Sequence, residues 1–226
     1  MWHELPLNCL YMKLKELKLL VDQGEGEHIE FKRKARHPEK IVREIVAFAN
    51  SKGGYLIVGV DDNGQIPGLK HYDEDKYVLD RVIASHCRPA IRYRFNLVKL
   101  SDHRAVLVYH ILPSRKRPHF ALEYEDQKWG QAYIRIEDRT VQASKEMVQI
   151  LKRQRRRKPV QFTYGTNEKT LFQILEENGK ITIQELIDHT KMQPKEASNM
   201  LIDMVVADIL QVQAREKEDF YMLKPT

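Results

Sequence analysis

The sequence predicts an α/β (α+β) protein with a mixed sheet and helices, followed by a small winged helix-turn-helix domain. Two observations support the first part: residues 28–33 alternate between apolar and polar side chains, and Tyr55–Val60 is a nearly continuous apolar run. A segment of helical periodicity separates them, as in a strand–helix–strand unit. A third observation supports the second part, because residues 166–226 contain three helical patterns and then two short strand patterns.

Apolar residues between Leu10 and Val21 recur at helical spacing and predict an amphipathic first helix. Residues 28–33 predict a strand, with Glu30 and Lys32 on one face. The next helix is expected to begin at Pro38, which fits a first helical turn, and to end near Asn50. Its expected buried stripe is Ile41, Ile45, Phe48 and Ala49.

The run Tyr55–Val60 predicts a strand covered on both faces, and Asn63-Gly64 predicts a turn. Further elements are expected in this order: a helix near 73–86, strands near 91–100 and 105–112, a basic loop at 113–119, a strand at 131–136, and a helix from about residue 144. In the last part we expect helices near 167–177, 184–190 and 194–207, a short strand at 181–183, and a hairpin of 211–215 with 220–223. Three helices followed by a hairpin are typical of a winged helix-turn-helix.

A run of six cations and one glutamine, Lys152–Lys158, is interpreted as a domain boundary. The expected domains are therefore residues 1–151, a basic linker at 152–165, and residues 166–226. The linker cations fit a solvated helix end and a phosphate-binding segment equally well.

The composition is that of a globular protein, with 42% hydrophobic and 31% charged residues. No apolar run approaches the roughly 20 residues of a membrane helix, so we expect no membrane partner. Cys9 and Cys87 are the only cysteines, too few for a disulfide framework or a cysteine-based zinc site. We expect a reduced, cytoplasmic setting and no zinc.

The net charge of +6 is unevenly distributed along the chain. Residues 1–158 hold 31 Lys and Arg against 21 Asp and Glu, a net +10, and residues 159–226 hold 7 against 11, a net −4. A basic surface attracts polyanions such as nucleic acid. The alternative explanation is that the positive charge only increases solubility.

Carboxylates gather between Glu25 and Asp62 within this basic part. Glu25 and Glu30 are five residues apart across a glycine, and Asp61 and Asp62 follow the apolar run. Carboxylate oxygens suit Mg²⁺ or Mn²⁺, and Lys32 beside Glu30 could stabilise charge on a phosphate. The same residues are also explained as solvated turn residues and an exposed ion pair.

From Glu25 to about Leu151 the chain resembles the Schlafen AlbA_2 domain family. The resemblance is carried, in order, by Glu30-Phe31-Lys32, Ala47-Phe48-Ala49-Asn50, Gly53-Gly54, Gly59-Val60-Asp61-Asp62 with Gly64 and Gly68, Pro113-Ser114, Pro118, and Tyr133-Ile134-Arg135. It implies an Alba-like nucleic-acid-binding fold in residues 1–151.

In the vertebrate Schlafen nucleases, two glutamates five apart and an aspartate near a later strand form a metal-dependent RNA-cleaving site. The resemblance therefore implies Glu25, Glu30 and Asp62, with Asp61 as the alternative, as ligands of Mg²⁺ or Mn²⁺, and Lys32 beside the scissile phosphate. The cysteine-rich zinc site of those proteins has no counterpart here. They carry two lobes and this sequence carries one, so we expect a homodimer.

Bacterial family members with a helix-turn-helix have been described as transcriptional regulators or ATP-binding proteins. We do not expect ATP binding, because no G-x-x-x-x-G-K-[ST] loop is present and Gly53-Gly54 fits a tight turn. The best candidates for phosphate contact share a positive charge near the carboxylates or in the basic loop: Lys32, Arg33, Lys34, Arg36, Arg115, Lys116, Arg117 and Arg135.

The predicted winged helix offers Ser198 and Asn199 for base edges, but its acidic residues, including the tip 216–219, oppose an approach to DNA. Dimerisation or protein binding is therefore favoured for it. Three hypotheses remain: a nucleic-acid-binding protein, RNA favoured over DNA, that is a candidate metal-dependent endoribonuclease; a non-catalytic DNA-binding transcriptional regulator; and a protein-interaction adaptor.

Overall fold

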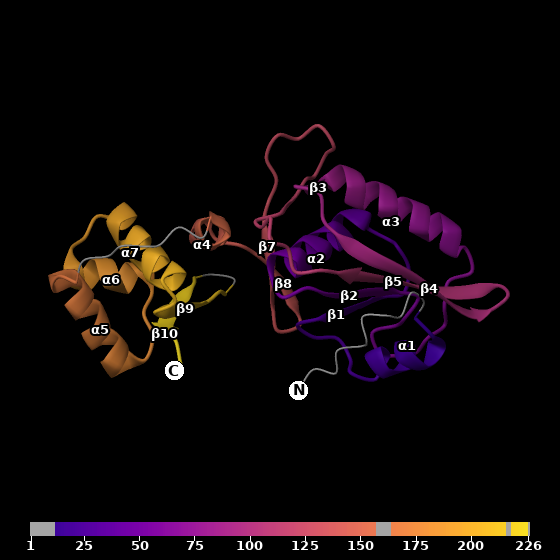
Figure 1. Ribbon diagram of the computed structural model, residues 1–226, viewed down its shortest axis with the longest axis horizontal. Coiled ribbons are helices and arrows are strands. Elements are labelled where there is room, and N and C mark those ends of the chain that lie inside the picture. Colours follow the sequence, from indigo (N-terminus) through magenta and orange to yellow (C-terminus); the bar gives the residue numbers. More distant parts are fainter. Residues whose placement is uncertain (1–11, 157–163, 216–217, 226) are drawn as a thin grey trace. The chain divides into compact units, whose positions relative to one another are not determined.

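The computed structural model describes residues 12–156, 164–215 and 218–225, and its contacts divide the chain into two units, residues 1–140 and 141–226. Each unit contains both helices and β-sheet, as Figure 1 shows. The predicted α/β class is confirmed.

The main sheet of the first unit has four strands in the order β1-β2-β5-β4. They are β1 (Ile29–Lys32), β2 (Gly54–Val58), β4 (Tyr93–Ser101) and β5 (Arg104–Ile111). β1 runs parallel to β2, and the other neighbouring pairs are antiparallel. β1 is therefore an edge strand, and helix α2 (Pro38–Asn50) connects it to β2.

Helix α2 begins where the sequence predicts, with Pro38 in its first turn, and ends at Asn50. Two glycines then bring the chain back into the sheet. Gly53 has φ +81°, and a Cβ there would lie 2.7 Å from the carbonyl oxygen of Ile111. A Cβ at Gly54 would lie 2.5 Å from the Phe48 ring. Only glycine fits such a close approach of helix and sheet, so the predicted tight turn is confirmed.

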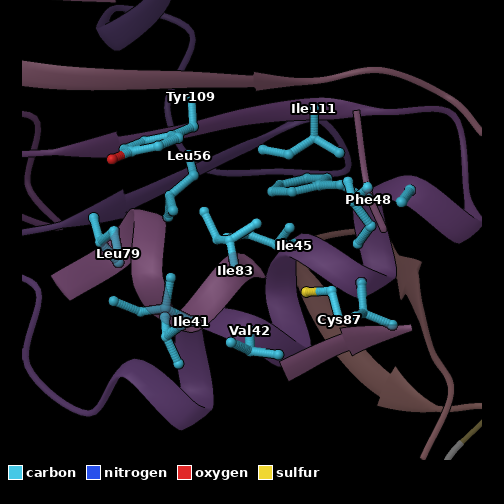
Figure 2. Packing of buried hydrophobic residues seen from close by; sticks show 14 of the residues in the cluster. Ile41, Val42, Ile45, Phe48, Leu56, Leu79, Ile83, Cys87, Tyr109 and Ile111 are labelled. Atoms are coloured by element: carbon cyan, nitrogen blue, oxygen red, sulfur yellow. The ribbon is translucent and has the colours of Figure 1, made fainter. Parts of the chain in front are cut away.

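Apolar residues cover both faces of the sheet. On one face, α2 and α3 (Tyr72–His86) pack against Leu56, Tyr109 and Ile111, as Figure 2 shows. On the other, α1 (Leu14–Val21) packs with Phe31 and its neighbours. The predicted stripe of α2 is buried, with Ile41, Ile45, Phe48 and Ala49 all at 0% exposure. The run after Gly54 is covered on both faces, as predicted.

Two pairs of short strands complete this unit. β3 (Cys87–Arg88) pairs with β6 (Phe120–Ala121), and β7 (Tyr133–Ile136) pairs with β8 (Arg139–Gln142). β7 lies within the strand predicted at 131–136, whereas the sequence did not predict the other three. β3 and β6 have only two residues each, and two residues carry too little periodicity to be recognised in a sequence.

The second unit contains α4 (Lys145–Arg156), α5 (Thr166–Asn178), α6 (Ile183–Thr190), α7 (Pro194–Val206), β9 (Leu210–Gln213) and β10 (Phe220–Leu223). Gly179 in the left-handed conformation ends α5, and a capping box between Thr182 and Glu185 begins α6. β9 and β10 form an antiparallel hairpin. The predicted strand at 181–183 is reduced to one bridge, Ile181 to Tyr221, because α6 starts at Ile183. The order of elements is the one expected, and the assignment as a winged helix stays a prediction.

Residues 152–156 continue helix α4, which agrees with the helix expected from about residue 144 and with a helix end at the basic run, and the contacts place α4 in the second unit. The expected domain boundaries stay a prediction. Met147, Ile150 and Leu151 are buried, which gives α4 one apolar face.

Leu10, the cations at 157 and 158, and the acidic tip at 216 and 217 lie outside the described residues. In the described part of the chain, no helix has the length and apolarity needed to cross a membrane.

Candidate functional site

The carboxyl ends of β1 and β2 lie side by side, because the strands are parallel and in register from Ile29–Tyr55 to Lys32–Val58. The Lys32 carbonyl accepts a hydrogen bond from Gly59 N at 2.7 Å. Asp61 and Asp62 follow within the turn after β2. The pairing of Glu30 with Leu56 places Glu30 and Lys32 on the face covered by α2.

Both side-chain oxygens of Glu30 have cationic partners. Lys32 Nζ donates to Oε1, and Arg135 Nη1 donates to Oε2 at 2.9 Å. The Glu30 side chain is 12% exposed and that of Arg135 only 1%. Glu30 and Lys32 thus form an ion pair, as the alternative interpretation expected, but the pair is largely enclosed.

Arg135 is buried rather than presented to solvent. Its Nη2 donates to the Gly26 carbonyl at 2.6 Å, Nη1 also donates to Thr140 Oγ1 at 3.1 Å, and the guanidinium lies 4.9 Å from the centre of the Phe48 ring. Contact with a phosphate would require this network to open. In the structure, Arg135 holds Glu30 against the entry to β1.

Glu44 on α2 is a member of the site that the sequence analysis missed. Its Oε1 lies 3.2 Å from Lys32 Nζ. Burial, and after it the charge of Glu30, raises the pKa of Glu44 to about 7, although Lys32 opposes the shift. The available signal was a glutamate at 44 within the helical stripe that includes Ile41 and Phe48, where a buried apolar residue would be usual.

Lys32 is therefore shared between two carboxylates. Burial lowers its pKa, but the charges and hydrogen bonds of Glu44 and Glu30 outweigh that effect and leave the pKa raised. With Arg135, Lys32 supplies the positive charge that compensates these two acids.

Glu25 closes the free edge of β1. Its Oε1 accepts a hydrogen bond from Phe31 N at 2.8 Å. Burial raises the pKa of Glu25, the Phe31 bond opposes this, and the negative charges of Glu30 and Asp62 raise it further. Glu25 is thus within electrostatic reach of both Glu30 and Asp62.

The two aspartates after β2 have different surroundings. Asp61 lies 3.4 Å from Arg33 Nε, and its Oδ1 is shielded from solvent without a hydrogen bond among the described residues. Asp62 is exposed and is the aspartate that raises the pKa of Glu25. The choice between Asp62 and Asp61 as the partner of the glutamates stays a prediction.

As a metal site, these residues fit a hard divalent cation in type but not in their present bonding. Glu25, Glu30 and Asp62 provide carboxylate oxygens, and their mutual repulsion would be relieved by a cation. Yet both oxygens of Glu30 are bonded to Lys32 and Arg135. Among the described residues, no three His, Cys, Asp or Glu side chains form a ready group for a metal.

The remaining phosphate-contact candidates are mostly at the surface. Arg33, Lys34, Arg36, Arg115 and Lys116 are exposed. Arg117 is half-buried, and burial lowers its pKa. The outer cations of the site and the basic loop thus face solvent, whereas Lys32 and Arg135 face the acids.

A buried network supports the basic loop at 113–119, and the sequence analysis did not foresee it. The Asn50 side chain accepts from His119 N at 2.7 Å and donates to the carbonyls of His119 and Tyr133, both at 2.9 Å. The His119 ring lies 2.7 Å from the Pro89 carbonyl and 2.6 Å from Ser114 Oγ. The asparagine of the Ala47–Asn50 motif therefore fixes the base of this loop.

In the second unit, α4 contacts α7, the helix that would read DNA in the alternative hypothesis of a transcriptional regulator. Ser198 Oγ donates to Glu146 at 3.0 Å, and Arg153 donates to Asn199 Oδ1 at 2.7 Å and to Asp203. Both residues proposed for base edges are thus hydrogen-bonded to α4. These contacts compete with any reading of bases by Ser198 and Asn199.

Assigning α4 to the second unit also changes the distribution of charge. Residues 141–226 hold 14 Lys and Arg against 12 Asp and Glu, a net +2, and residues 1–140 hold 24 against 20, a net +4. The sequence analysis counted the basic run Lys152–Lys158 with the first part of the chain. The predicted repulsion between the last part and DNA depended on that division.

Comparison with known proteins gives a family and several solved structures, of which two are described below. No curated protein matches the chain. The N-terminal domain of a putative ATP-dependent DNA helicase RecG-related protein from Nitrosomonas europaea is 27% identical over 53% of this chain and 87% of that domain, with a TM-score of 0.40. The DIP2311 protein from Corynebacterium diphtheriae is 16% identical over 81% of this chain and 33% of that chain, with a TM-score of 0.42.

The family model described as Schlafen, AlbA_2 matches residues 25–144. This is more than half of the chain, and it includes the first-unit strands, α2 and the carboxylate cluster. The chain therefore belongs to the Schlafen AlbA_2 family.

Proposed function

We propose that this chain binds nucleic acid through its first unit, with RNA favoured over DNA, and that it is a candidate endoribonuclease acting on structured RNA such as tRNA or rRNA. Membership of the Schlafen AlbA_2 family indicates a nucleic-acid-related function. The preference for RNA and the cleavage follow from the resemblance to the vertebrate Schlafen nucleases.

The observation that supports the binding proposal is that the cations of the first unit fall into an enclosed group and an exposed group. Lys32 and Arg135 compensate the buried acids, whereas Lys34, Arg36, Arg115 and Lys116 are exposed. Exposed cations can neutralise phosphates without first breaking a buried ion pair.

The cleavage proposal is supported by the position of three carboxylates around neighbouring strands: Glu25 accepts a hydrogen bond from Phe31 N of β1, Glu30 lies on β1, and Asp62 follows β2, which pairs in parallel with β1. In this proposal Glu25, Glu30 and Asp62 would hold Mg²⁺ or Mn²⁺, with Asp61 as the alternative. Such an ion, when bound, polarises a phosphodiester and lowers the pKa of a bound water. Glu30 would first have to release Lys32 or Arg135, and a released Lys32 could stabilise charge on the phosphate.

Binding is tested with the full chain and two fluorescent probes, a structured RNA and a DNA duplex of equal length. The variants K34Q/R36Q and R115Q/K116Q should each weaken RNA binding about tenfold at low salt, because each removes two phosphate contacts. The matched control K15Q/K18Q removes two exposed cations from α1 and should bind as the wild type does. If no variant alters RNA binding, the proposed surface is wrong.

Cleavage is tested with Mn²⁺ and with a chelator on tRNA, rRNA and single-stranded RNA. Asp62→Asn changes an exposed residue and should abolish cleavage while binding persists; Asp102→Asn, in an exposed turn, is its control. Intact substrates after incubation with wild-type protein and Mn²⁺ would rule out the nuclease.

The proposal includes a homodimer, because the chain carries one AlbA_2 unit where the vertebrate nucleases combine two lobes in a cleft. Sedimentation equilibrium should give twice the mass of the chain, and a monomer at all concentrations would refute the dimer. Tighter binding of duplex DNA than of RNA would favour the transcriptional regulator. Absence of binding to either polymer would leave the protein-interaction adaptor.

A further inference from the structure

Helix α4 has one apolar face, and that face is buried in the structure. Met147, Ile150 and Leu151 are buried, and Ile150 belongs to the same core as Leu171 and Leu201. An amphipathic helix that binds a membrane needs a free apolar face, so α4 does not have the form of a membrane-surface helix.

Polar contacts fasten the same helix to α7 at two points. Near its start, Glu146 accepts a hydrogen bond from Ser198 at 3.0 Å. Further along, Arg153 is bonded to Asp203 and to Asn199. Arg153 is thus used for attachment, and α4 is held in one position on the second unit.

Three cations in the last two turns of α4 take no part in these contacts. Lys152, Arg155 and Arg156 line a surface hollow of about 270 Å³. Their spacing of three and four residues places them on one side of the helix. Lys152, Arg155 and Arg156 are exposed, and none of them forms an ion pair with any residue that the structure describes.

We infer that Lys152, Arg155 and Arg156 form a polynucleotide phosphate-binding site in the second unit, separate from the site near β1. The inference rests on the proposed nucleic-acid binding and adds a second contact region to it. Three exposed cations on a fixed helix retain their positive charge for phosphates, and a hollow lets an anion contact more than one of them.

This site binds the backbone and does not read sequence. Phosphate contacts carry no sequence information, and the base-reading candidates Ser198 and Asn199 are bonded to α4. The second unit therefore contributes affinity that is similar for different sequences of equal length.

The test uses the full chain, with a single-stranded RNA and a DNA duplex as separate probes, at salt concentrations from about 50 to about 200 mM NaCl. The variant K152Q/R155Q/R156Q should weaken binding of at least one probe about tenfold or more. It should also reduce the slope of log K against log salt by about 2 for single strands or about 2.7 for duplex. Which probe is affected identifies the polymer that uses the site.

The matched control K145Q/K169Q/K191Q removes three exposed lysines from the same unit and should keep the wild-type slope. An unchanged slope in the α4 variant, with binding still sensitive to R115Q/K116Q, would overturn this inference and leave the proposed function intact. Absence of binding by the wild type to both probes would overturn both.

Two further readouts separate phosphate binding from a role in helix stability and from membrane binding. The α4 variant should keep the wild-type melting temperature, and a lower melting temperature with unchanged binding would show that the cations only stabilise the end of the helix. Binding of anionic phospholipid vesicles that is lost in the variant, without nucleic-acid binding, would assign the site to a membrane and contradict the inference.

Discussion

Two groups of cations in this chain have opposite surroundings. In the first unit, Lys32 and Arg135 are enclosed with Glu30 and Glu44. In the second, Lys152, Arg155 and Arg156 lie at the surface of α4. The first group fixes the positions of carboxylates, and the second is available to an external anion. Net charge along a sequence does not distinguish these two uses, because each cation counts equally.

The largest expected effect on stability follows from removing one member of the enclosed group. Arg135→Met should destabilise the protein by about 3–5 kcal/mol, because Glu30 would keep a buried charge without its partner. Arg33→Met is the control, since Arg33 is 71% exposed beside Asp61 and should change stability by about 1 kcal/mol or less. Urea unfolding followed by circular dichroism measures both. Equal effects would mean that Arg135 does not hold the site together.

A second effect concerns the base of the loop at 113–119. Asn50→Ala should cost about 2–3 kcal/mol, because a buried backbone N–H and two carbonyls lose their partner. Asn178→Ala, at the exposed end of α5, should stay within about 0.5 kcal/mol. If Asn50→Ala changed the free energy of unfolding only slightly, the hydrogen bonds of Asn50 to the loop would not contribute to the stability of the first unit.

The raised pKa of Glu44 predicts a dependence of stability on pH. The folded state keeps this proton up to about pH 7, whereas the unfolded state releases it near the ordinary value of 4.5. Stability should therefore fall as pH rises between these values, by on the order of 1–3 kcal/mol. Glu44→Gln should remove this decline, and Glu176→Gln on the exposed side of α5 should not. Parallel pH profiles for wild type and Glu44→Gln would contradict the assignment.

The smallest effect is expected at the attachment of α4. The side chains of Arg153 and Asp203 are 32% and 34% exposed, so their pair should contribute about 0.5–1 kcal/mol. A double-mutant cycle of Arg153→Gln and Asp203→Asn measures it. If the coupling energy of Arg153 with Asp203 were as large as that of Arg135 with Glu30, the enclosed and the surface ion pairs would not differ in their contribution to stability.

The sequence predicted the elements around the site well, because β1, α2 and β2 have strong periodicities and clear ends at Pro38 and Gly53-Gly54. It could not predict the partners of Glu30. Arg135 is 105 residues away, and only the folded sheet brings it to the edge strand. Likewise, Asn50 meets His119 across 69 residues. The resemblance located the carboxylates, but their bonding required the structure.

The boundary between the two units is a different case, because the sequence itself contains both a helix pattern and a linker-like run of charges at this point. Met147, Ile150 and Leu151 have the spacing of an apolar helix face, yet the run of cations after them suggested a linker. In the structure α4 is part of the second unit, so its charges belong there.

Lysine footprinting of the full chain, with and without bound RNA, reports each amine separately and shows directly whether exposed cations bind phosphates while enclosed cations do not. Bound RNA should protect Lys34, Lys116 and Lys152 from acetylation and leave Lys169 and Lys191 unchanged. Lys32, enclosed by Glu30 and Glu44, should react slowly in both states. Protection confined to Lys191 and Lys195 near the start of α7, or no protection at saturating RNA, would contradict this difference between exposed and enclosed cations.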